Sequence, residues 1–255
     1  MIRLGLIKAV PVKWDVEANW KTFEMLARRG AERGAQLIVT PECFLDGYVS
    51  PVKKGFSKAR LAKVSQPLRG PGYVKRAREL ARELAVHFVF GFSQKARNGS
   101  YNAAALINDS GKVLGVYHKT HLHASPKETH DLRYLPGKAL NVWETSLGRI
   151  GIMICADRRW PETARTLKVK GAQLIANPTY GMCHLDNEWW MRTRSYENEI
   201  YIAFTHPEVS LITGPRGQVD AKLESNMPDI LVHDIDLDNL PRDMFPYRRA
   251  DIYTK

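Results

Sequence analysis

The stretch that decides the fold is RIGIMICADRRWPETARTLKVKG, which occupies residues 149–171. Its first part is a short apolar run of the kind that forms a buried β-strand, and the run ends at Cys155. Pro161 then opens a helical pattern that Gly171 closes, because proline suits the first helical turn and glycine the position after the last. A buried strand followed at once by a helix is the building unit of an α/β protein.

The alternation of strands and helices continues from this stretch in both directions along the chain. The elements expected outside it are strands at 2–11, 36–40, 87–93, 101–108, 112–118, 173–177 and 200–206, two or three strands within 209–236, and helices from Asp15 to Gly34, at 71–85 and at 187–199. Asp15 is the expected N-cap of its helix and Gly34 the expected stop signal. The whole pattern predicts an α/β fold in which helices cover the faces of a sheet.

One segment has no regular pattern: residues 120–145 are polar, irregular and rich in histidine and proline. A loop of this length inside a compact domain is usually functional or disordered. The chain contains no internal repeat and no linker rich in glycine, serine or proline. We therefore expect residues 1–255 to form a single domain.

The composition limits the classes of protein to which the chain can belong. Apolar residues make up 44% of the chain, which is enough for a sizeable core. No run of about 18 apolar residues is present, so we expect no membrane span. The first residues, MIRLGLIKAV, lack the pattern of a secretory signal, and three cysteines (Cys43, Cys155 and Cys183) cannot all pair. Both features favour the reducing cytoplasm.

The net charge of +11 is concentrated in one region, because ten basic residues and only two acidic ones lie between Lys53 and Glu83. A basic surface of this kind suits nucleic acids or other anions. No nucleic-acid-binding motif accompanies the charge, and a solvated helix face with a loop accounts for it. We therefore expect no nucleic-acid partner, although the same charge would help to attract an anionic substrate.

Three side chains with catalytic chemistry lie where predicted strands end. Cys155 precedes a helix, Glu42 follows the short strand at 36–40, and Lys119 follows the strand at 112–118. The carboxyl ends of strands are where α/β proteins bind ligands, so a thiol, a carboxylate and an ammonium could converge there. Each residue alone has an ordinary explanation, such as a buried structural cysteine or a solvated lysine.

The segments around these residues resemble the nitrilase (carbon–nitrogen hydrolase) superfamily. GIMICADRRWPETAR at 151–165 is similar to its nucleophile segment, IVTPECFLDGY at 38–48 to its glutamate segment, and YNAAALINDSGKVLGVYHKTHL at 101–122 to its lysine segment. Further similarity lies at 192–204, 214–219, 234–237 and 247–253. The nucleophile segment is most similar to that of the N-carbamoyl-D-amino-acid hydrolases. The resemblance covers nearly the whole chain in the family's order.

The resemblance implies a four-layer α-β-β-α sandwich, pairing of protomers across a helical face into dimers or higher oligomers, and no metal or organic cofactor. It also implies a catalytic triad, with Glu42 as base, Lys119 as cation and Cys155 as nucleophile. A second catalytic glutamate precedes a Pro-Gly pair in many members of the family. Glu128, which lies before Pro136 and Gly137, is its best match here.

A mechanism follows from these roles as a hypothesis. Glu42 would accept the thiol proton of Cys155, and the thiolate would attack an amide or ureido carbonyl. The ammonium of Lys119 and the backbone N–H of Ala156 would hold the oxyanion. Glu42 would then protonate the leaving amine and later activate water to hydrolyse the thioester.

The substrate is less constrained than the chemistry. Arg158 and Arg159 match the arginines that help the carbamoyl hydrolases to bind a substrate carboxylate, and a guanidinium fork suits that group. Alternatively, one or both hold their own loop through Asp157 or Glu162. His121 is expected to line the pocket. We therefore expect a small substrate that bears a carboxylate.

Alternatives to this substrate remain open. An ω-amidase, a nitrile hydrolase and a catalytically silent member that binds a ligand or partner are all compatible with the motifs. The chain also departs from the family, because the region at 205–215 is shortened and lacks the usual Gly-x-Ser, and Ala156 replaces a polar residue.

A cluster of histidines near Lys119 raises the question of a metal site. His118, His121, His123 and His130 lie close together in the sequence, but their spacing matches no strong zinc pattern. A polar pocket loop explains them more simply, and we expect no metal.

Overall fold

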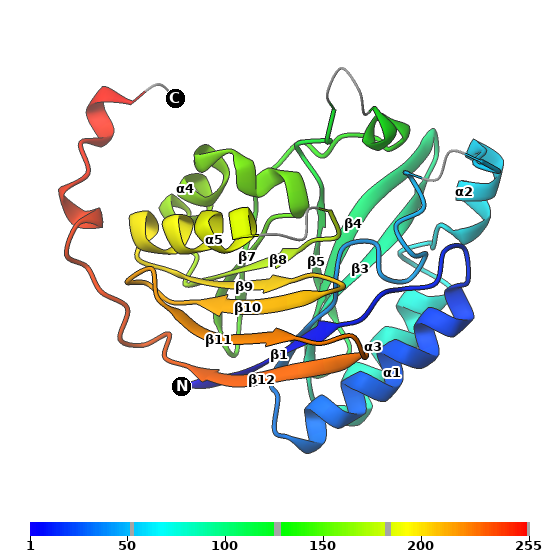
Figure 1. The fold of residues 1–255 in the computed structure, drawn as a ribbon, viewed down its shortest axis with the longest axis horizontal. Coiled ribbons are helices and arrows are strands. Elements are labelled where there is room, and N and C mark those ends of the chain that lie inside the picture. Colours follow the sequence, from blue (N-terminus) through cyan, green and yellow to red (C-terminus); the bar gives the residue numbers. More distant parts are fainter. Residues whose placement is uncertain (52–53, 125–128, 182–184, 254–255) are drawn as a thin grey trace.

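The chain forms two six-stranded β-sheets packed face to face (Figure 1). The computed structural model describes residues 1–51, 54–124, 129–181 and 185–253. The first sheet has the order β12-β1-β2-β3-β4-β5 and the second the order β11-β10-β9-β8-β7-β6. The three adjacent strands β1, β2 and β3 are parallel, as are β7, β8 and β9. Each sheet therefore has a parallel centre with antiparallel edges.

The strands of the first sheet are β1 (Ile2–Lys8), β2 (Leu37–Val39), β3 (His87–Ala96), β4 (Gly99–Ile107), β5 (Val113–His118) and β12 (Asp229–Ile235). Those of the second are β6 (Val142–Thr145), β7 (Gly148–Ile152), β8 (Leu174–Pro178), β9 (Tyr201–Thr205), β10 (Val209–Thr213) and β11 (Val219–Glu224). Leu4, Val39, Ile152 and Ala176 are among the fully buried side chains where the two inner faces meet. The central core therefore lies between the sheets.

Helices cover both outer faces. α1 (Val16–Glu32) and α3 (Tyr73–Leu84) pack on the first sheet, and α4 (Pro161–Val169) and α5 (Leu185–Asn198) on the second, on the opposite side of the molecule in Figure 1. A short helix that the sequence did not suggest, α2 (Lys58–Val64), lies beside β3 and β4. The four layers confirm the predicted α-β-β-α sandwich.

The first helix shows why the sequence folds locally as predicted. The side chain of Asp15 accepts a hydrogen bond of 2.9 Å from the backbone N–H of Ala18, which satisfies one of the free amides of the first turn. Trp20, Phe23 and Leu26 are buried on the face that packs against the sheet. Their spacing of three residues places them on one side of the helix.

The irregular segment at 120–145 contains more structure than its sequence suggests. It includes the 3₁₀ helix η1 (His130–Arg133) and β6, which forms the edge of the second sheet as a hairpin with β7. The indole of Trp143 in β6 packs where a Cβ on Gly115 of β5 would lie, so the strand is anchored by a partner from the other sheet. That contact is long-range and therefore invisible to local periodicity.

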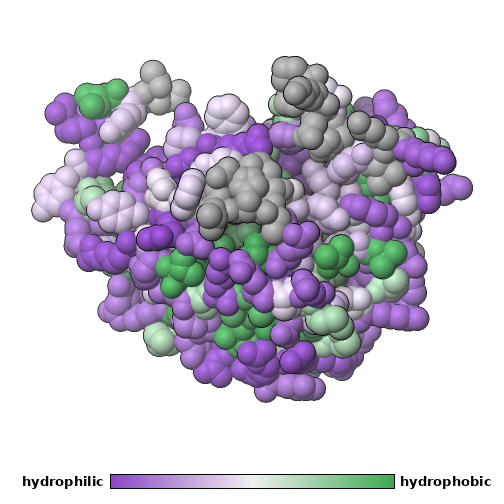
Figure 2. All heavy atoms as spheres, viewed as in Figure 1, coloured by the Kyte–Doolittle hydropathy of each residue, from purple (hydrophilic) through white to green (hydrophobic). Residues whose placement is uncertain are grey.

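The surface is mainly hydrophilic on the face in Figure 2, with small hydrophobic patches between charged residues. Among the helices in the described parts of the chain, none is both long and apolar enough to cross a membrane. After β12 the chain leaves the sheets and runs outward past α5 (Figure 1).

Candidate active site

A buried lysine lies between two carboxylates. The Nζ of Lys119, directly after β5, donates hydrogen bonds of 2.8 Å to Oε1 of Glu42 and 2.5 Å to Oδ2 of Asp131. Glu42 lies in the loop after β2, and Asp131 belongs to η1. The side chains of all three residues are 0% exposed. Two of the residues predicted to act together are thus in direct contact, and a third residue joins them.

The charges in this group support one another. Burial by itself lowers the pKa of Lys119, but the negative charges of Glu42 and Asp131, and of Cys155 when it is a thiolate, outweigh this effect and raise that pKa well above its ordinary value. Burial raises the pKa of Asp131, but the effect of the neighbouring Lys119 is opposite and larger, so the net shift of that pKa is downward. The ammonium and the Asp131 carboxylate therefore both remain charged near neutral pH. Removal of one partner would leave a buried charge uncompensated.

Glu42 has one carboxylate oxygen committed and one available. Its Oε1 accepts hydrogen bonds from Lys119 and, at 2.7 Å, from Nδ2 of Asn102 on β4. Its Oε2 is buried, and no residue in the described part of the chain hydrogen-bonds to it. A buried carboxylate oxygen without a donor is costly unless a ligand or a transferred proton meets it. The arrangement leaves Oε2 able to accept a proton.

Cys155 lies in a strained turn. β7 ends at Ile152, three residues earlier than the sequence suggested, and Cys155 begins the 3₁₀ helix η2 (Cys155–Arg159). Its backbone has a φ of 47°, in the left-handed region that residues other than glycine rarely adopt. Residues with such strained backbones are concentrated at functional sites. Burial is the main cause that raises the pKa of Tyr48, and a thiolate at Cys155 lies close enough to contribute to the upward shifts of both Tyr48 and Lys119. Glu42, Lys119 and Cys155 therefore share one buried site.

Asp157 ties the cysteine turn to the lysine segment. Its Oδ1 accepts hydrogen bonds from the backbone N–H and ring Nδ1 of His121, both 2.8 Å, and from the Thr120 hydroxyl at 2.9 Å. Its Oδ2 accepts from the Tyr117 hydroxyl at 2.7 Å and from the N–H of Ile154 at 2.9 Å. One buried carboxylate thus fixes β5 and its continuation against the turn that carries Cys155.

The two arginines after the cysteine have different surroundings. Arg158 is 1% exposed, and its Nε and Nη2 donate to Oδ1 of Asn187 at 2.9 Å and 2.6 Å. Its Nη1 donates to the Sγ of Cys155 at 3.3 Å. Arg159 is half-buried, and its Nη1 lies 3.3 Å from Nδ1 of His123. Carboxylate binding by either residue stays a prediction.

Some site residues were missed by the sequence reasoning. Asp131 also accepts hydrogen bonds from the Tyr48 hydroxyl at 2.9 Å and from the N–H of His123 at 2.9 Å, which makes it a central acceptor of the site. Glu128, the residue predicted to be the second catalytic glutamate, lies outside the described residues. Asn102 gave a weak signal as a polar residue within an apolar strand. Asn187 gave none.

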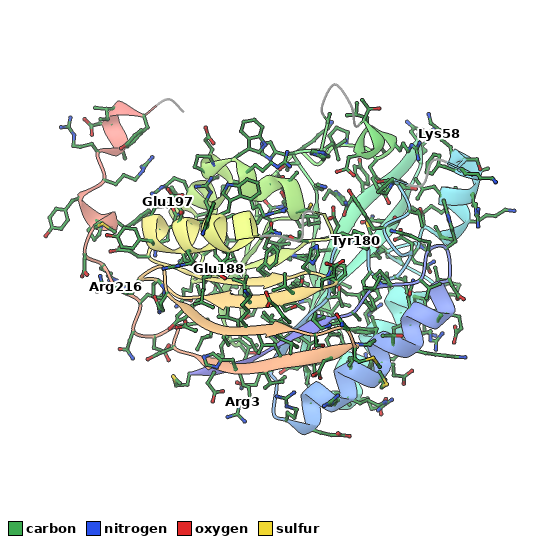
Figure 3. The ribbon with its side chains drawn as sticks, viewed as in Figure 1. Arg3, Lys58, Tyr180, Glu188, Glu197 and Arg216 are labelled. Atoms are coloured by element: carbon green, nitrogen blue, oxygen red, sulfur yellow. The ribbon has the colours of Figure 1, made fainter. Side chains whose placement is uncertain are left out.

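The rim of the site is built from aromatic rings and a lysine. The rings of Tyr48 and Tyr180 lie 4.9 Å apart between centroids, and Figure 3 labels Tyr180 just beyond the end of β8. The Nζ of Lys13 lies 4.1 Å from the Tyr180 ring centroid and donates to the carbonyls of Gly47 and Tyr48. Burial lowers the pKa of Lys13 to about 8. Lys13 thus braces the loop that carries Glu42.

The predicted cluster of histidines is dispersed among separate partners. His118 lies 2.9 Å from Gln94 and stacks on Tyr101, whereas His121 contacts Asp157. The side chain of His130 is not among the described ones. Within the described ranges, no three histidine, cysteine or acidic side chains are grouped so as to hold a metal ion.

The chain is similar to known amidases in sequence. The family model for carbon-nitrogen hydrolase matches residues 3–242. The N-carbamoylputrescine amidase of rice (Oryza sativa subsp. japonica) is 29% identical over 275 residues, which cover 94% of this chain and 89% of that protein. The N-carbamoylputrescine amidase of potato (Solanum tuberosum) is 33% identical over 168 residues, which cover 65% of this chain. The matched part is only 54% of the potato protein.

A solved structure has the same fold. A mutant of the amidase from Nesterenkonia sp. AN1 superposes with a TM-score of 0.80 at 25% identity, and the match covers 98% of each chain. That structure shows the result of Michael addition of acrylamide at the active-site cysteine of that amidase.

Proposed function

Because this chain belongs to the carbon–nitrogen hydrolase family, we propose that it hydrolyses a non-peptide C–N bond of a small amide or N-carbamoyl compound through a thioester on Cys155. The observation that carries the proposal is the buried group of Glu42, Lys119 and Cys155. In it a strained cysteine shares one site with a lysine held between two carboxylates. The amidase and carbamoyl-hydrolysing relatives support the same chemistry.

The first half of the reaction forms the thioester. Glu42 takes the thiol proton of Cys155, and the thiolate attacks the carbonyl carbon, so that an S–C bond forms and the C=O electron pair moves to oxygen. Lys119 and the N–H of Ala156 stabilise this oxyanion, since amides in the first turn of a helix have no partner within it. The C–N bond then breaks as Glu42 returns the proton to the leaving nitrogen.

The second half releases the product. Water adds to the thioester carbon while Glu42 accepts one of its protons. The S–C bond breaks, the sulfur takes the proton back from Glu42, and the acid leaves. Asp131 holds the ammonium of Lys119 in place throughout, since the two are hydrogen-bonded. Whether Glu128 acts as a second catalytic glutamate stays a prediction.

The substrate is a small molecule, and a carboxylate on it is a further proposal. Arg159 is the better of the two predicted carboxylate binders, because its guanidinium is half-buried whereas that of Arg158 is enclosed. Arg159 lies 5.7 Å from the Trp190 ring centroid, a position at which it can meet a ligand from the solvent side. His121, also partly exposed, lies beside Trp160 and is the proposed pocket-lining histidine.

We also propose that the protein is a homodimer or a higher homo-oligomer of the cytoplasm. Large hydrophobic side chains are exposed on α5 and the C-terminal segment, including Trp189 at 59%, Tyr196 at 51% and Tyr247 at 82%. A groove lined by α4, α5 and that segment runs beside them. Apolar surface of this kind is typical of an interface. Cys43 and Cys155 are free thiols, as suits a reducing compartment.

The experiment that tests the function is ammonia release from a panel of N-carbamoyl amino acids in both enantiomers, N-carbamoyl amines, ω-amides and nitriles. Cys155→Ala is the control, and full turnover of a verified substrate by this variant would refute the mechanism. Release from carbamoyl compounds alone would support the carbamoyl reading. Release from ω-amides or nitriles alone would keep the triad and discard that reading, and silence across the panel would favour a member that only binds.

A further inference from the structure

We propose that Arg158 is a further catalytic residue, whose guanidinium stabilises the thiolate of Cys155, and that Asn187 is the positioning residue that holds it there. The inference rests on the proposed function only in taking Cys155 as the nucleophile. It assigns to Arg158 a role toward the enzyme's own sulfur in place of one toward a substrate carboxylate.

The hydrogen bonds of Arg158 determine which part of the guanidinium is available. A carboxylate is bound through two parallel N–H groups along one edge of the fork. The edge formed by Nε and Nη2 is taken by the single Oδ1 of Asn187. Nη2 also donates to the carbonyl of Gly181 at 3.2 Å. What remains is Nη1, and it points at the Sγ of Cys155.

The guanidinium is enclosed rather than solvated. Its central carbon lies 5.3 Å from the ring centroid of Trp190 and 5.9 Å from that of Phe204. In the described part of the chain no carboxylate forms an ion pair with Arg158, although burial of a charge normally requires a counter-charge. A thiolate at Cys155 supplies that counter-charge at hydrogen-bond distance.

The charge balance of the site is consistent with this role. Among the groups that contact Lys119 or the sulfur directly, Lys119 and Arg158 carry the positive charges before proton transfer, and Glu42 and Asp131 the negative ones. Transfer of the thiol proton to Glu42 moves one negative charge from Glu42 to the sulfur and leaves the total unchanged. That charge arrives beside Arg158, where a charge-assisted hydrogen bond stabilises it, as nearby cations do for other reactive cysteines.

The chemistry of Asn187 fits its role as an anchor. Its amide oxygen accepts two hydrogen bonds and fixes the guanidinium without neutralising it. An aspartate at this position would keep the same shape but would compete with the thiolate for the positive charge. Asn187→Asp is therefore an almost isosteric test of the electrostatic part of the proposal.

The test measures the alkylation rate of Cys155 by iodoacetamide, a neutral reagent, at fixed pH with the modified peptide identified by mass spectrometry. It compares the wild type with Arg158→Lys, Arg158→Gln and Asn187→Asp. Arg192→Gln removes one exposed positive charge from the same helix as Asn187 and is the matched control. We expect alkylation to fall by about tenfold or more in Arg158→Gln and Asn187→Asp, less in Arg158→Lys, and not in the control.

Two results would overturn the proposal. One is alkylation within about twofold of wild type in both Arg158→Gln and folded Asn187→Asp, judged by circular dichroism. The other comes from the same variants treated with iodoacetate, the anionic reagent. A fall in alkylation by iodoacetate but not by iodoacetamide would make Arg158 a carboxylate binder. Because alkylation needs no substrate, this readout stands apart from the ammonia-release panel. The role of Arg158 can therefore be refuted while the proposed hydrolysis holds, and the proposed hydrolysis can be refuted while the role of Arg158 holds.

Discussion

The ammonium of Lys119 lies 2.5 Å from the carboxylate of Asp131, a residue twelve positions further along the chain. Together with Glu42 on its other side, this contact gives the lysine two buried anionic partners. The lysine is therefore held charged and fixed in position, which is what an oxyanion-stabilising group requires.

Replacement of Asp131 by asparagine should disable the lysine. Asparagine removes one negative charge beside Lys119, so the pKa of the ammonium should fall and the alkaline limb of the pH profile should move to lower pH. We expect kcat to fall by about 100-fold, because the oxyanion contact is both weaker and less well positioned. The measurement is kcat against pH, with Asp131→Glu as the variant that keeps the charge. An unchanged alkaline limb in Asp131→Asn would contradict this role.

Glu42→Gln tests the base. Glutamine keeps an oxygen that accepts the hydrogen bonds of Lys119 and Asn102, but it cannot accept a proton. We expect kcat/KM to fall by about 100-fold or more, the usual contribution of a positioned general base. Steady-state ammonia release on the best substrate of the panel checks this. Retention of more than about a tenth of wild-type activity would argue for another base.

Asp157→Asn tests the link between the lysine segment and the cysteine turn. Asparagine keeps only one oxygen, so either the donors to Oδ1, which include His121, or the donors to Oδ2, which include the N–H of Ile154, lose their acceptor. We expect the free energy of unfolding to fall by about 2–3 kcal/mol and kcat to fall with little change in KM, because Asp157 positions both reacting segments. Thermal or urea unfolding and steady-state kinetics are the measurements. An equal loss of stability with an unchanged kcat would reduce Asp157 to a structural residue.

His206 should make the fold sensitive to acid. Burial lowers its pKa from 6.5 to about 4, so the unfolded chain binds a proton between these values that the folded protein excludes. Its contribution to stability is therefore fully present above pH 6.5 and is lost as the pH falls toward 4. The loss amounts to about 3 kcal/mol, at 1.4 kcal/mol for each pKa unit.

The comparison that isolates this effect is wild type against His206→Gln, with urea unfolding measured from pH 7 to pH 4. Burial raises the pKa of Asp46 to about 6, so the protonation of Asp46 stabilises the fold over the same pH range. Because Asp46 is present in both proteins, its effect cancels in the difference. We expect the stability of the wild type relative to the variant to fall with acidification. A difference that is independent of pH would show that His206 titrates normally.

Tyr196→Arg should weaken the proposed dimer. Tyr196 is half exposed on α5 and lines the groove between that helix and the C-terminal segment. A charged side chain buried in an isologous interface meets its own copy or an apolar surface, and both are unfavourable. Sedimentation velocity measures the mass. Met227→Arg, at an exposed hydrophobic position in the loop that connects β11 to β12, is the control. Identical masses in both variants would place the interface elsewhere.

Local signals in the sequence were enough to predict most of the fold. The alternation of apolar runs with amphipathic periods predicted the order of elements, and the side chain of Asp15 caps its helix as expected. These features depend on neighbours a few residues away, which is why they can be read from the chain alone. Family resemblance added the four layers and the roles of Glu42, Lys119 and Cys155. The extent of a single domain and those roles remain predictions.

The tertiary structure alone decided which side chains complete the site. Asp131 and Asn102 contact Lys119 and Glu42, and Asn187 contacts Arg158, but none of these pairs is joined by a local repeat or a turn. The partner of a buried polar group depends on where distant strands and loops bring their donors and acceptors. By itself, therefore, the sequence determined that the three reactive groups follow the carboxyl ends of strands, with Lys119 directly after β5 and Glu42 and Cys155 three residues after β2 and β7. Only the packing of two sheets and the course of the segment at 129–145 decided their partners, because a buried charge takes whichever counter-charge the fold places within reach.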